Sequence, residues 1–348
     1  MRVLVTGPTP KLAGSQQVLQ FAKNSASLVE VLQLGGHAVE WRGVKPGEDL
    51  AAYDRVITYL CPANSIGANQ LYGTLWVLSQ RPDAFYALGD WQVRQIITAA
   101  RSVFKRGPKE LFKDRMSHRY HYDVAQEYPE QMLAGLRELI DGSHVNRTCF
   151  TPLFRRGKPE NLGFVQVKKH VVFDPTVVWL ERYTALIKQW RDDKMHDLPV
   201  TSFDKKEQWV HASLLKKEEW VAKQQLDWPV LAYGNRKLGQ PRVPELDLLP
   251  VICQSWGVLS APHNNPGSGW WRARFAIAAA CDTIVYGDRR EQSVVYGSGN
   301  FPNSSSDVER VSEEKRFAMI STQRRALEDQ MMSNDELMST INKALESN

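Results

Sequence analysis

The sequence is poor in cysteine, and its four cysteines lie at distant positions with no Cys-x-x-Cys pair. Neither a disulfide framework nor a structural zinc site fits such spacing. Long apolar runs are also missing, since no stretch approaches the roughly 18 residues that span a bilayer. The first ten residues, MRVLVTGPTP, fit a β-strand better than a signal peptide. We therefore expect a cytoplasmic protein with no metal ligands and no membrane partner.

Several signatures of nucleotide-dependent and hydrolytic enzymes are missing as well. The chain contains no GxxxxGK[ST] phosphate loop, no GxGxxG after the first predicted strand, no GxSxG and no HExxH. These absences argue against a P-loop NTPase and against a dinucleotide-dependent dehydrogenase. The sequence does contain enough apolar residues, 43% of 348, for about two globular domains.

The first half of the chain alternates between strand-like and helix-like segments. Apolar residues at helical spacing predict a helix over Ser25–Leu34, and Gly35-Gly36 is typical of a helix end. Strands are predicted around it, at Val3–Thr6, His37–Trp41, Asp54–Leu60 and Phe85–Leu88. This α/β alternation indicates parallel βαβ units, whose ligands bind beyond the carboxyl ends of the strands.

The second half alternates in the same way after Thr151–Gly163, a stretch rich in Pro, Gly and charge that we interpret as a linker. Helices are predicted at Met116–Asp141, Trp209–Gln225, Ala273–Cys281 and in the tail from Asp307. Candidate strands are Val171–Phe173, Pro199–Phe203, Val230–Tyr233, Leu249–Cys253 and Thr283–Tyr286. We expect two facing doubly wound domains with a cleft between them. The first is 1–160, joined by a C-terminal helix of about 328–348, and the second is 161–327.

Positive charge is concentrated in one part of the chain. The net charge is +5, from 44 basic and 39 acidic residues. Residues 101–120 alone hold seven basic and two acidic residues, a net charge equal to the excess of the whole chain. Such a segment either forms a solvated surface or contacts the phosphates of a nucleic acid.

Two stretches could carry chemistry. Asp90 follows the predicted strand Phe85–Leu88, where a carboxylate can act as a general base, although aspartate is also typical of a helix N-cap. The stretch Pro266–Phe275, PGSGWWRARF, leads from a glycine-rich loop into a helix with Arg272 and Arg274. A helix N-terminus with arginines is a phosphate-binding arrangement, and the alternative is an ordinary surface helix.

Taken in order, these stretches resemble the DNA β-glucosyltransferases of T-even phages. The similarity runs through SLVEVLQLGGHAVEW (27–41), YDRVITYLCPANSIGANQ (53–70), FYALGDWQVR (85–94), VLAYGN (230–235), WWRARFAIAAACDTIVYGD (270–288) and AMISTQRRAL (318–327). Their order and spacing, not any single motif, carry the resemblance. It implies a GT-B fold of two facing Rossmann-like domains. The implied reaction is an inverting transfer from a UDP-sugar, UDP-glucose foremost, to a 5-hydroxymethyl pyrimidine of double-stranded phage DNA, a modification that protects against host nucleases.

The resemblance also assigns roles to residues by position. Asp90 matches the catalytic base, Arg274 the arginine that grips the donor diphosphate, and Gly234-Asn235 the turn that lines the nucleotide pocket. The donor-binding residues that it implies are Arg274, Arg272, Ser213, Lys216, Tyr233, Gly234 and Asn235. The DNA-binding residues that it implies are Arg94, Arg101, Lys105, Arg106, Lys109, Lys113 and Arg115. A monomer is expected, and Mg²⁺ or Mn²⁺ is compatible with the donor.

The sequence departs from this family at three places. Ile277 stands where the family has the acidic residue that holds the donor ribose, and Gln92 stands where it has an arginine. The family's arginine-rich donor loop has only HASLLKKEE, His211–Glu219, as its nearest counterpart. Two other functions therefore stay open: a GT-B enzyme for a small molecule, lipid or glycan, and a non-catalytic binder of DNA or nucleotide.

Overall fold

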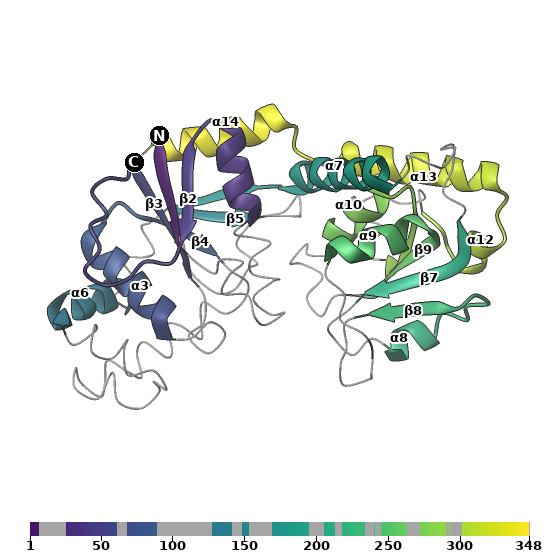
Figure 1. The fold of residues 1–348 in the computed structure, drawn as a ribbon, viewed down its shortest axis with the longest axis horizontal. Coiled ribbons are helices and arrows are strands. Elements are labelled where there is room, and N and C mark those ends of the chain that lie inside the picture. Colours follow the sequence, from purple (N-terminus) through teal and green to yellow (C-terminus); the bar gives the residue numbers. More distant parts are fainter. Residues whose placement is uncertain are drawn as a thin grey trace. The chain divides into compact units, whose positions relative to one another are not determined.

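The chain folds into two compact units in a computed structural model. The described residues are 1–6, 26–60, 68–88, 127–140, 148–152, 169–194, 205–212, 218–233, 240, 245–262, 272–289, 292 and 301–347. The first unit comprises residues 1–175 together with 334–348, and the second comprises residues 176–333. Figure 1 shows a strand-and-helix core in each unit.

The first unit is built on a six-stranded parallel sheet with the order β2-β1-β3-β4-β5-β6. Its strands are β1 (Arg2–Thr6), β2 (Ala38–Arg42), β3 (Arg55–Leu60), β4 (Phe85–Leu88), β5 (Thr148–Pro152) and β6 (Lys169–Phe173). The predicted strands at the start of the chain are confirmed. Strand β1, which lies between β2 and β3, is buried from Val3 to Thr6, whereas the edge strand β2 is only half-buried.

Helices α3 (Ala68–Gln80) and α6 (Pro129–Ile140) pack together beside this sheet, and their apolar residues share its core. The close approach depends on Gly135, where a Cβ would lie 2.0 Å from the carbonyl oxygen of Leu75. Residues 26–34 form the predicted helix between β1 and β2, with Leu28 and Val31 buried. It ends at Gly36, whose φ of 79° is the left-handed value that glycine allows.

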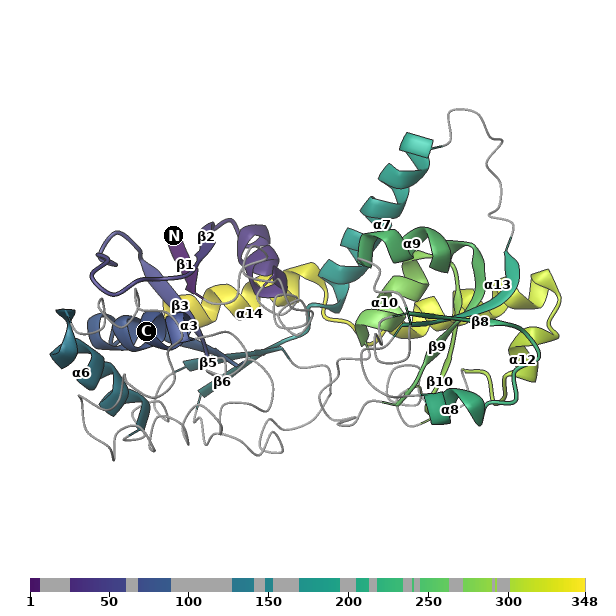
Figure 2. The ribbon, with the colours of Figure 1, turned by 60° about the horizontal axis from the view of Figure 1, so that its bottom comes forward.

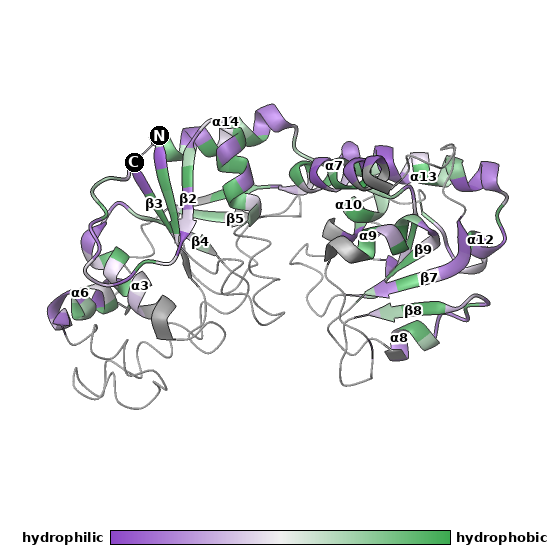
Figure 3. Cartoon of the chain, in the orientation of Figure 1, coloured by the Kyte–Doolittle hydropathy of each residue, from purple (hydrophilic) through white to green (hydrophobic). Residues whose placement is uncertain are grey.

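The C-terminal helix α14 (Asn334–Glu346) belongs to the first unit. It buries Leu337, Ile341 and Leu345, three of the residues that the sequence places on one face. Figure 3 shows hydrophilic and hydrophobic residues alternating along this helix. Two polar contacts fix its end: the Arg55 side chain donates to the carbonyl of Leu345 at 2.8 Å, and His37 Nε2 lies 2.8 Å from Asn342 Oδ1.

The second unit is built on a four-stranded parallel sheet with the order β10-β9-β7-β8. Figure 2 labels β8, β9 and β10 of this sheet. Its strands are β7 (Lys206–Ala212), β8 (Val230–Tyr233), β9 (Ser255–Ser260) and β10 (Ile284–Gly287). Its helices include α7 (Thr176–Lys194), α8 (Glu218–Ala222), α9 (Glu245–Cys253), α10 (Arg272–Ala280), α12 (Ser306–Glu309) and α13 (Glu313–Glu328). Helices α7, α9 and α10 pack against one another.

A tryptophan-rich core joins α12 to this sheet. Trp209 is fully buried on β7, and its indole nitrogen donates to Glu309 at 2.7 Å. The same carboxylate accepts the backbone N–H groups of Asp227 and Trp228. These hydrogen bonds compensate the cost of burying Glu309 and fix the turn that leads into β8.

Two predicted elements of the second unit are wrong. Trp209–Gln225 was expected to be helical, but residues up to Ala212 form strand β7, and among the described residues of that range only α8 is helical. Leu249–Cys253 was expected to be a strand, but it ends helix α9, which contains Pro250. A short apolar run fits either a buried strand or a buried helix, so periodicity alone did not separate them.

The boundary between the units also differs from the expected position. Strand β6 pairs with β5 in the first sheet, and the first unit continues to Pro175 rather than to residue 160. The first two residues of the expected linker, Thr151 and Pro152, belong to strand β5. The predicted strand Pro199–Phe203 lies outside the described residues. Among the helices that are described, none is long and apolar enough to cross a membrane.

Candidate functional site

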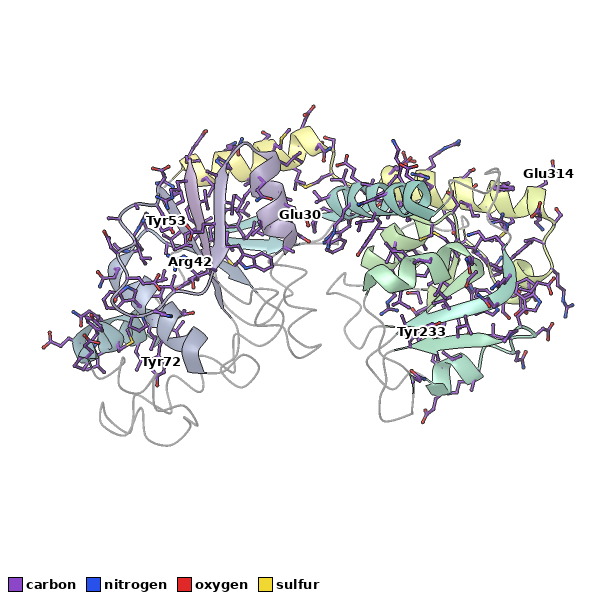
Figure 4. All side chains as sticks on the ribbon, in the orientation of Figure 1. Glu30, Arg42, Tyr53, Tyr72, Tyr233 and Glu314 are labelled. Carbon is purple, nitrogen blue, oxygen red and sulfur yellow. The ribbon has the colours of Figure 1, made fainter. Side chains whose placement is uncertain are left out.

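The carboxyl ends of the second sheet's strands form one edge. In the parallel register Tyr233 pairs with Ala212, and Gly287 pairs with Ser260, so the four strands end together. Figure 4 labels Tyr233 at the end of β8. Ligands of parallel α/β sheets bind beyond this kind of edge, which makes it the candidate site of the second unit.

Arg274 lies in the first turn of α10 and reaches back to this edge. Its Nη1 donates to Ser260 Oγ at 3.3 Å and to the carbonyl oxygen of Ala261 at 3.1 Å. Both acceptors are neutral, so these bonds orient the guanidinium without cancelling its charge. The first turn of α10 contains no acidic residue. The helix N-terminus and the arginine together favour an anion there.

Ser260 and Gly287 fit closely against each other at the same edge. A Cβ on Gly287 would lie 2.5 Å from the carbonyl oxygen of Ser260 and 2.9 Å from its Cβ. The carbonyl of Ser260 also accepts the backbone N–H of Asp288 at 3.3 Å. Ser260 is fully buried. The strand ends of β9 and β10 are therefore held in a fixed relation where Arg274 contacts them.

The corresponding edge of the first sheet is different. Thr6 is the last residue of β1 and pairs with Thr58 of β3. The buried hydroxyls of these two threonines form a 3.0 Å hydrogen bond. Arg42 ends β2, but it is bound by carboxylates: its Nε donates to Glu40 at 2.7 Å, and its Nη1 donates to Glu48. These hydrogen bonds raise the pKa of Arg42 despite partial burial.

The opposite, amino end of the second sheet also holds a cation. Lys205 precedes β7, and its Nζ donates to the carbonyl of Cys281 at 3.0 Å and to Thr283 Oγ1 at 2.9 Å. Burial lowers the pKa of this lysine from 10.5 to about 8. Because ligands of such sheets bind at the other edge, we interpret Lys205 as a structural group.

Few of the predicted site residues fall within the described part of the chain. Arg274 and Tyr233 are brought to the carboxyl edge of the second sheet, and the backbone of Arg272 begins α10. The remaining donor residues, Ser213, Lys216, Gly234 and Asn235, lie outside the described residues, as does Asp90. So do all the predicted DNA-binding residues: Arg94, Arg101, Lys105, Arg106, Lys109, Lys113 and Arg115.

One residue of this edge was missed by the sequence analysis. Ser260 ends β9, a strand that was not predicted because the apolar run just before it was taken as the strand. Strand β9 could have been predicted from the topology, since a parallel βαβ unit needs a strand directly before the loop that leads into α10. Within the described residues, no group of three or more His, Cys, Asp or Glu side chains is placed to hold a metal ion.

Comparison with known proteins supports the fold independently. No protein-family model matches the sequence, and no curated protein matches it. Several solved structures of the phage T4 β-glucosyltransferase do match, each covering 99% of this chain and 100% of that chain. A complex with UDP and Mn²⁺ is 14% identical with a TM-score of 0.62. A mutant bound to UDP-glucose is 13% identical with a TM-score of 0.64.

A third matching structure, described as the DNA-modifying enzyme β-glucosyltransferase with and without uridine diphosphoglucose, is 12% identical with a TM-score of 0.60. Similarity at this level of identity concerns the fold. The expected fold is confirmed: the chain has the GT-B fold of Rossmann-like domains, and its resemblance to the T-even phage β-glucosyltransferases extends over the whole chain in three dimensions.

Proposed function

We propose that this protein is an inverting glycosyltransferase that moves a sugar from a UDP-sugar to the hydroxymethyl group of a modified pyrimidine in double-stranded DNA. The observation that carries the proposal is Arg274 at the carboxyl edge of the second sheet, in a chain that shares its whole fold with a UDP-glucose-binding enzyme. An arginine at a helix N-terminus suits a diphosphate, which is the leaving group of such a donor.

In this proposal Asp90 takes the proton of the hydroxymethyl oxygen. That oxygen forms a bond to the anomeric carbon as the bond from this carbon to the UDP oxygen breaks, and the configuration at the carbon inverts. Arg274 neutralises the charge that develops on the departing diphosphate. The pyrimidine has to leave the base stack to reach the catalytic base, so base flipping is part of the proposal.

The remaining donor contacts are assigned to Arg272, Ser213, Lys216, Tyr233, Gly234 and Asn235. The DNA contacts are assigned to the basic segment 101–120, whose net charge of +5 suits a phosphate backbone. UDP-glucose is the first donor to test. A structure of the T4 enzyme contains Mn²⁺ with UDP, so each donor is assayed with and without a divalent cation.

The test is a transfer assay with a panel of UDP-sugars and duplexes that carry hydroxymethylcytosine, hydroxymethyluracil or only ordinary bases. The products are digested to nucleosides and analysed by mass spectrometry. We expect a mass increase of one sugar residue on a hydroxymethylated nucleoside and none on the ordinary duplex. UDP-sugar hydrolysis without any transfer to DNA would favour a small-molecule, lipid or glycan acceptor. Absence of both transfer and hydrolysis would favour a non-catalytic binding protein.

A further inference from the structure

We propose that Ser260 is a positioning residue for Arg274, and that its hydroxyl sets the affinity of the second unit for the donor diphosphate. The inference rests on the proposed function, because it assumes that Arg274 meets the diphosphate of a UDP-sugar. It concerns a residue of β9 that acts through the arginine rather than by contacting the reacting atoms.

Ser260 is one of the groups that hold the Arg274 side chain in place. The hydroxyl of Ser260 and the carbonyl of Ala261 both accept from Nη1, at 3.3 Å and 3.1 Å. A guanidinium carries five N–H groups, and two bonds at one nitrogen restrict its position while other N–H groups remain for a ligand to contact. The Ala261 anchor is backbone and present in every variant, whereas the Ser260 anchor depends on one side-chain oxygen.

Ser260 is itself held in place by the neighbouring strand. Its carbonyl accepts from Asp288 N at 3.3 Å, and Gly287 leaves no room for a Cβ beside it. Ser260 is fully buried, so its side chain has little freedom to turn. The hydroxyl is therefore a fixed acceptor, and fixing it also fixes the end of a long, flexible arginine side chain.

Such an anchor raises affinity by reducing the conformational freedom that the arginine loses on binding. Long side chains such as arginine carry a large rotamer entropy, and ligand binding has to overcome it unless the side chain is already ordered. A ligand-contacting side chain that is held in its bound conformation by a supporting residue binds the ligand more tightly than a mobile side chain does. Removing the hydroxyl should therefore weaken diphosphate binding without removing the charge.

The first experiment measures the Kd for UDP of Ser260→Ala by titration calorimetry. We expect the Kd to rise about 5-fold, the net effect of losing one ordinary hydrogen bond while the bond to the Ala261 carbonyl remains. Ser255→Ala is the matched control on the same strand. Ser255 is also fully buried and also accepts a side-chain hydrogen bond, from Gln208 at 2.9 Å, but it lies at the amino end of β9. Its variant should bind UDP like the wild type.

The second experiment separates positioning from a general structural effect by a double-mutant cycle with Arg274→Ala. If Ser260 acts through Arg274, then Ser260→Ala changes the Kd for UDP only while the arginine is present. An equal fold-change in both backgrounds would overturn the proposal. Should Ser260→Ala fail to fold, Ser260→Cys keeps an atom at the same place with a weak acceptor and replaces it in the cycle.

The two proposals fail in different ways. If Arg274→Ala leaves the Kd for UDP unchanged, the donor site of the proposed function is wrong, and the role of Ser260 falls with it. If Arg274→Ala weakens UDP binding but Ser260→Ala does not, the proposed donor site stands and the positioning role is wrong. Thermal unfolding of each variant verifies that the measured protein is folded.

Discussion

The two sheets each have an arginine at their carboxyl edge, and the two arginines differ in what they contact. Arg42, at the end of β2, donates to the carboxylates of Glu40 and Glu48. Arg274 donates to a hydroxyl and a carbonyl at the end of β9. Carboxylates offset the charge of Arg42 within the protein, whereas the hydroxyl and the carbonyl that accept from Arg274 orient its guanidinium. We therefore interpret Arg42, at the end of β2, as a structural group, and we propose a binding role only for Arg274, in the first turn of α10.

Lys205 shows why the chemical type of the cation matters in this comparison. Like Arg274 it donates to neutral oxygens, but it is a lysine, and burial lowers its pKa to about 8. A lysine in such surroundings can lose its proton, whereas a guanidinium keeps its charge at any physiological pH. An arginine therefore keeps the charge that an anion site needs over a wider pH range than a buried lysine does.

The largest effect is expected for Asp90→Ala, which would assign the chemical step to the first unit. We expect transfer to fall by about 10²–10⁴-fold, the range for loss of a general base. The Kd for UDP should not change, because the donor is assigned to the second unit. The measurement is single-turnover transfer to hydroxymethylated DNA, with UDP titration in parallel.

Asp83→Ala is the matched control for that substitution. Asp83 lies just before β4, whereas Asp90 follows β4 in the sequence, and the carboxylate of Asp83 is paired with Arg81 at 2.7 Å. This pairing lowers the pKa of Asp83. Its variant should be less stable but should transfer normally. Normal transfer by Asp90→Ala would remove Asp90 from the mechanism.

The next effect tests the comparison of the two arginines directly. Arg274→Ala should raise the KM for the UDP-sugar and lower kcat, because a charge-assisted contact is worth about 1.5–3 kcal/mol and strengthens as the leaving group gains charge. Arg42→Ala should lower the melting temperature and leave the donor KM unchanged. If both variants weakened donor binding equally, the proposed difference in role between Arg42 and Arg274 would be wrong.

The lowered pKa of Lys205 leads to a prediction about the pH dependence of stability rather than about ligand binding. Between pH 8 and pH 10 the unfolded chain, with an ordinary lysine pKa of 10.5, holds a proton that the folded protein has released. Stability therefore rises with pH in this range, and Lys205 should contribute about 2 kcal/mol to the rise. Urea unfolding from pH 7 to pH 10 measures it, and Lys205→Met should show a flatter profile with the same Kd for UDP. Identical pH profiles would show that the lysine titrates normally.

These cases also show what the sequence could and could not predict. Strands β1 to β4 and the helix of residues 26–34 were predictable, because apolar runs and a glycine helix end give local signals, whereas β5 was not predicted. Ser260 was not, because its role depends on two contacts made across the fold, to Arg274 and to Gly287. The same holds for Glu309, which looks like a surface residue in the sequence yet is buried beneath Trp209.

The smallest effect is expected from the basic segment 101–120, which the proposed function assigns to DNA rather than to the donor. Replacing Lys105 and Arg106 with alanine should flatten the dependence of log K for DNA on log salt by up to about two units, since each phosphate contact contributes about 0.9. The Kd for UDP should stay unchanged. The double variant Lys315→Ala with Arg325→Ala removes two exposed charges of α13 in the second unit as a control. If both pairs changed the slope equally, DNA binding would reflect net charge alone, and the acceptor would have to be sought among small molecules, lipids or glycans.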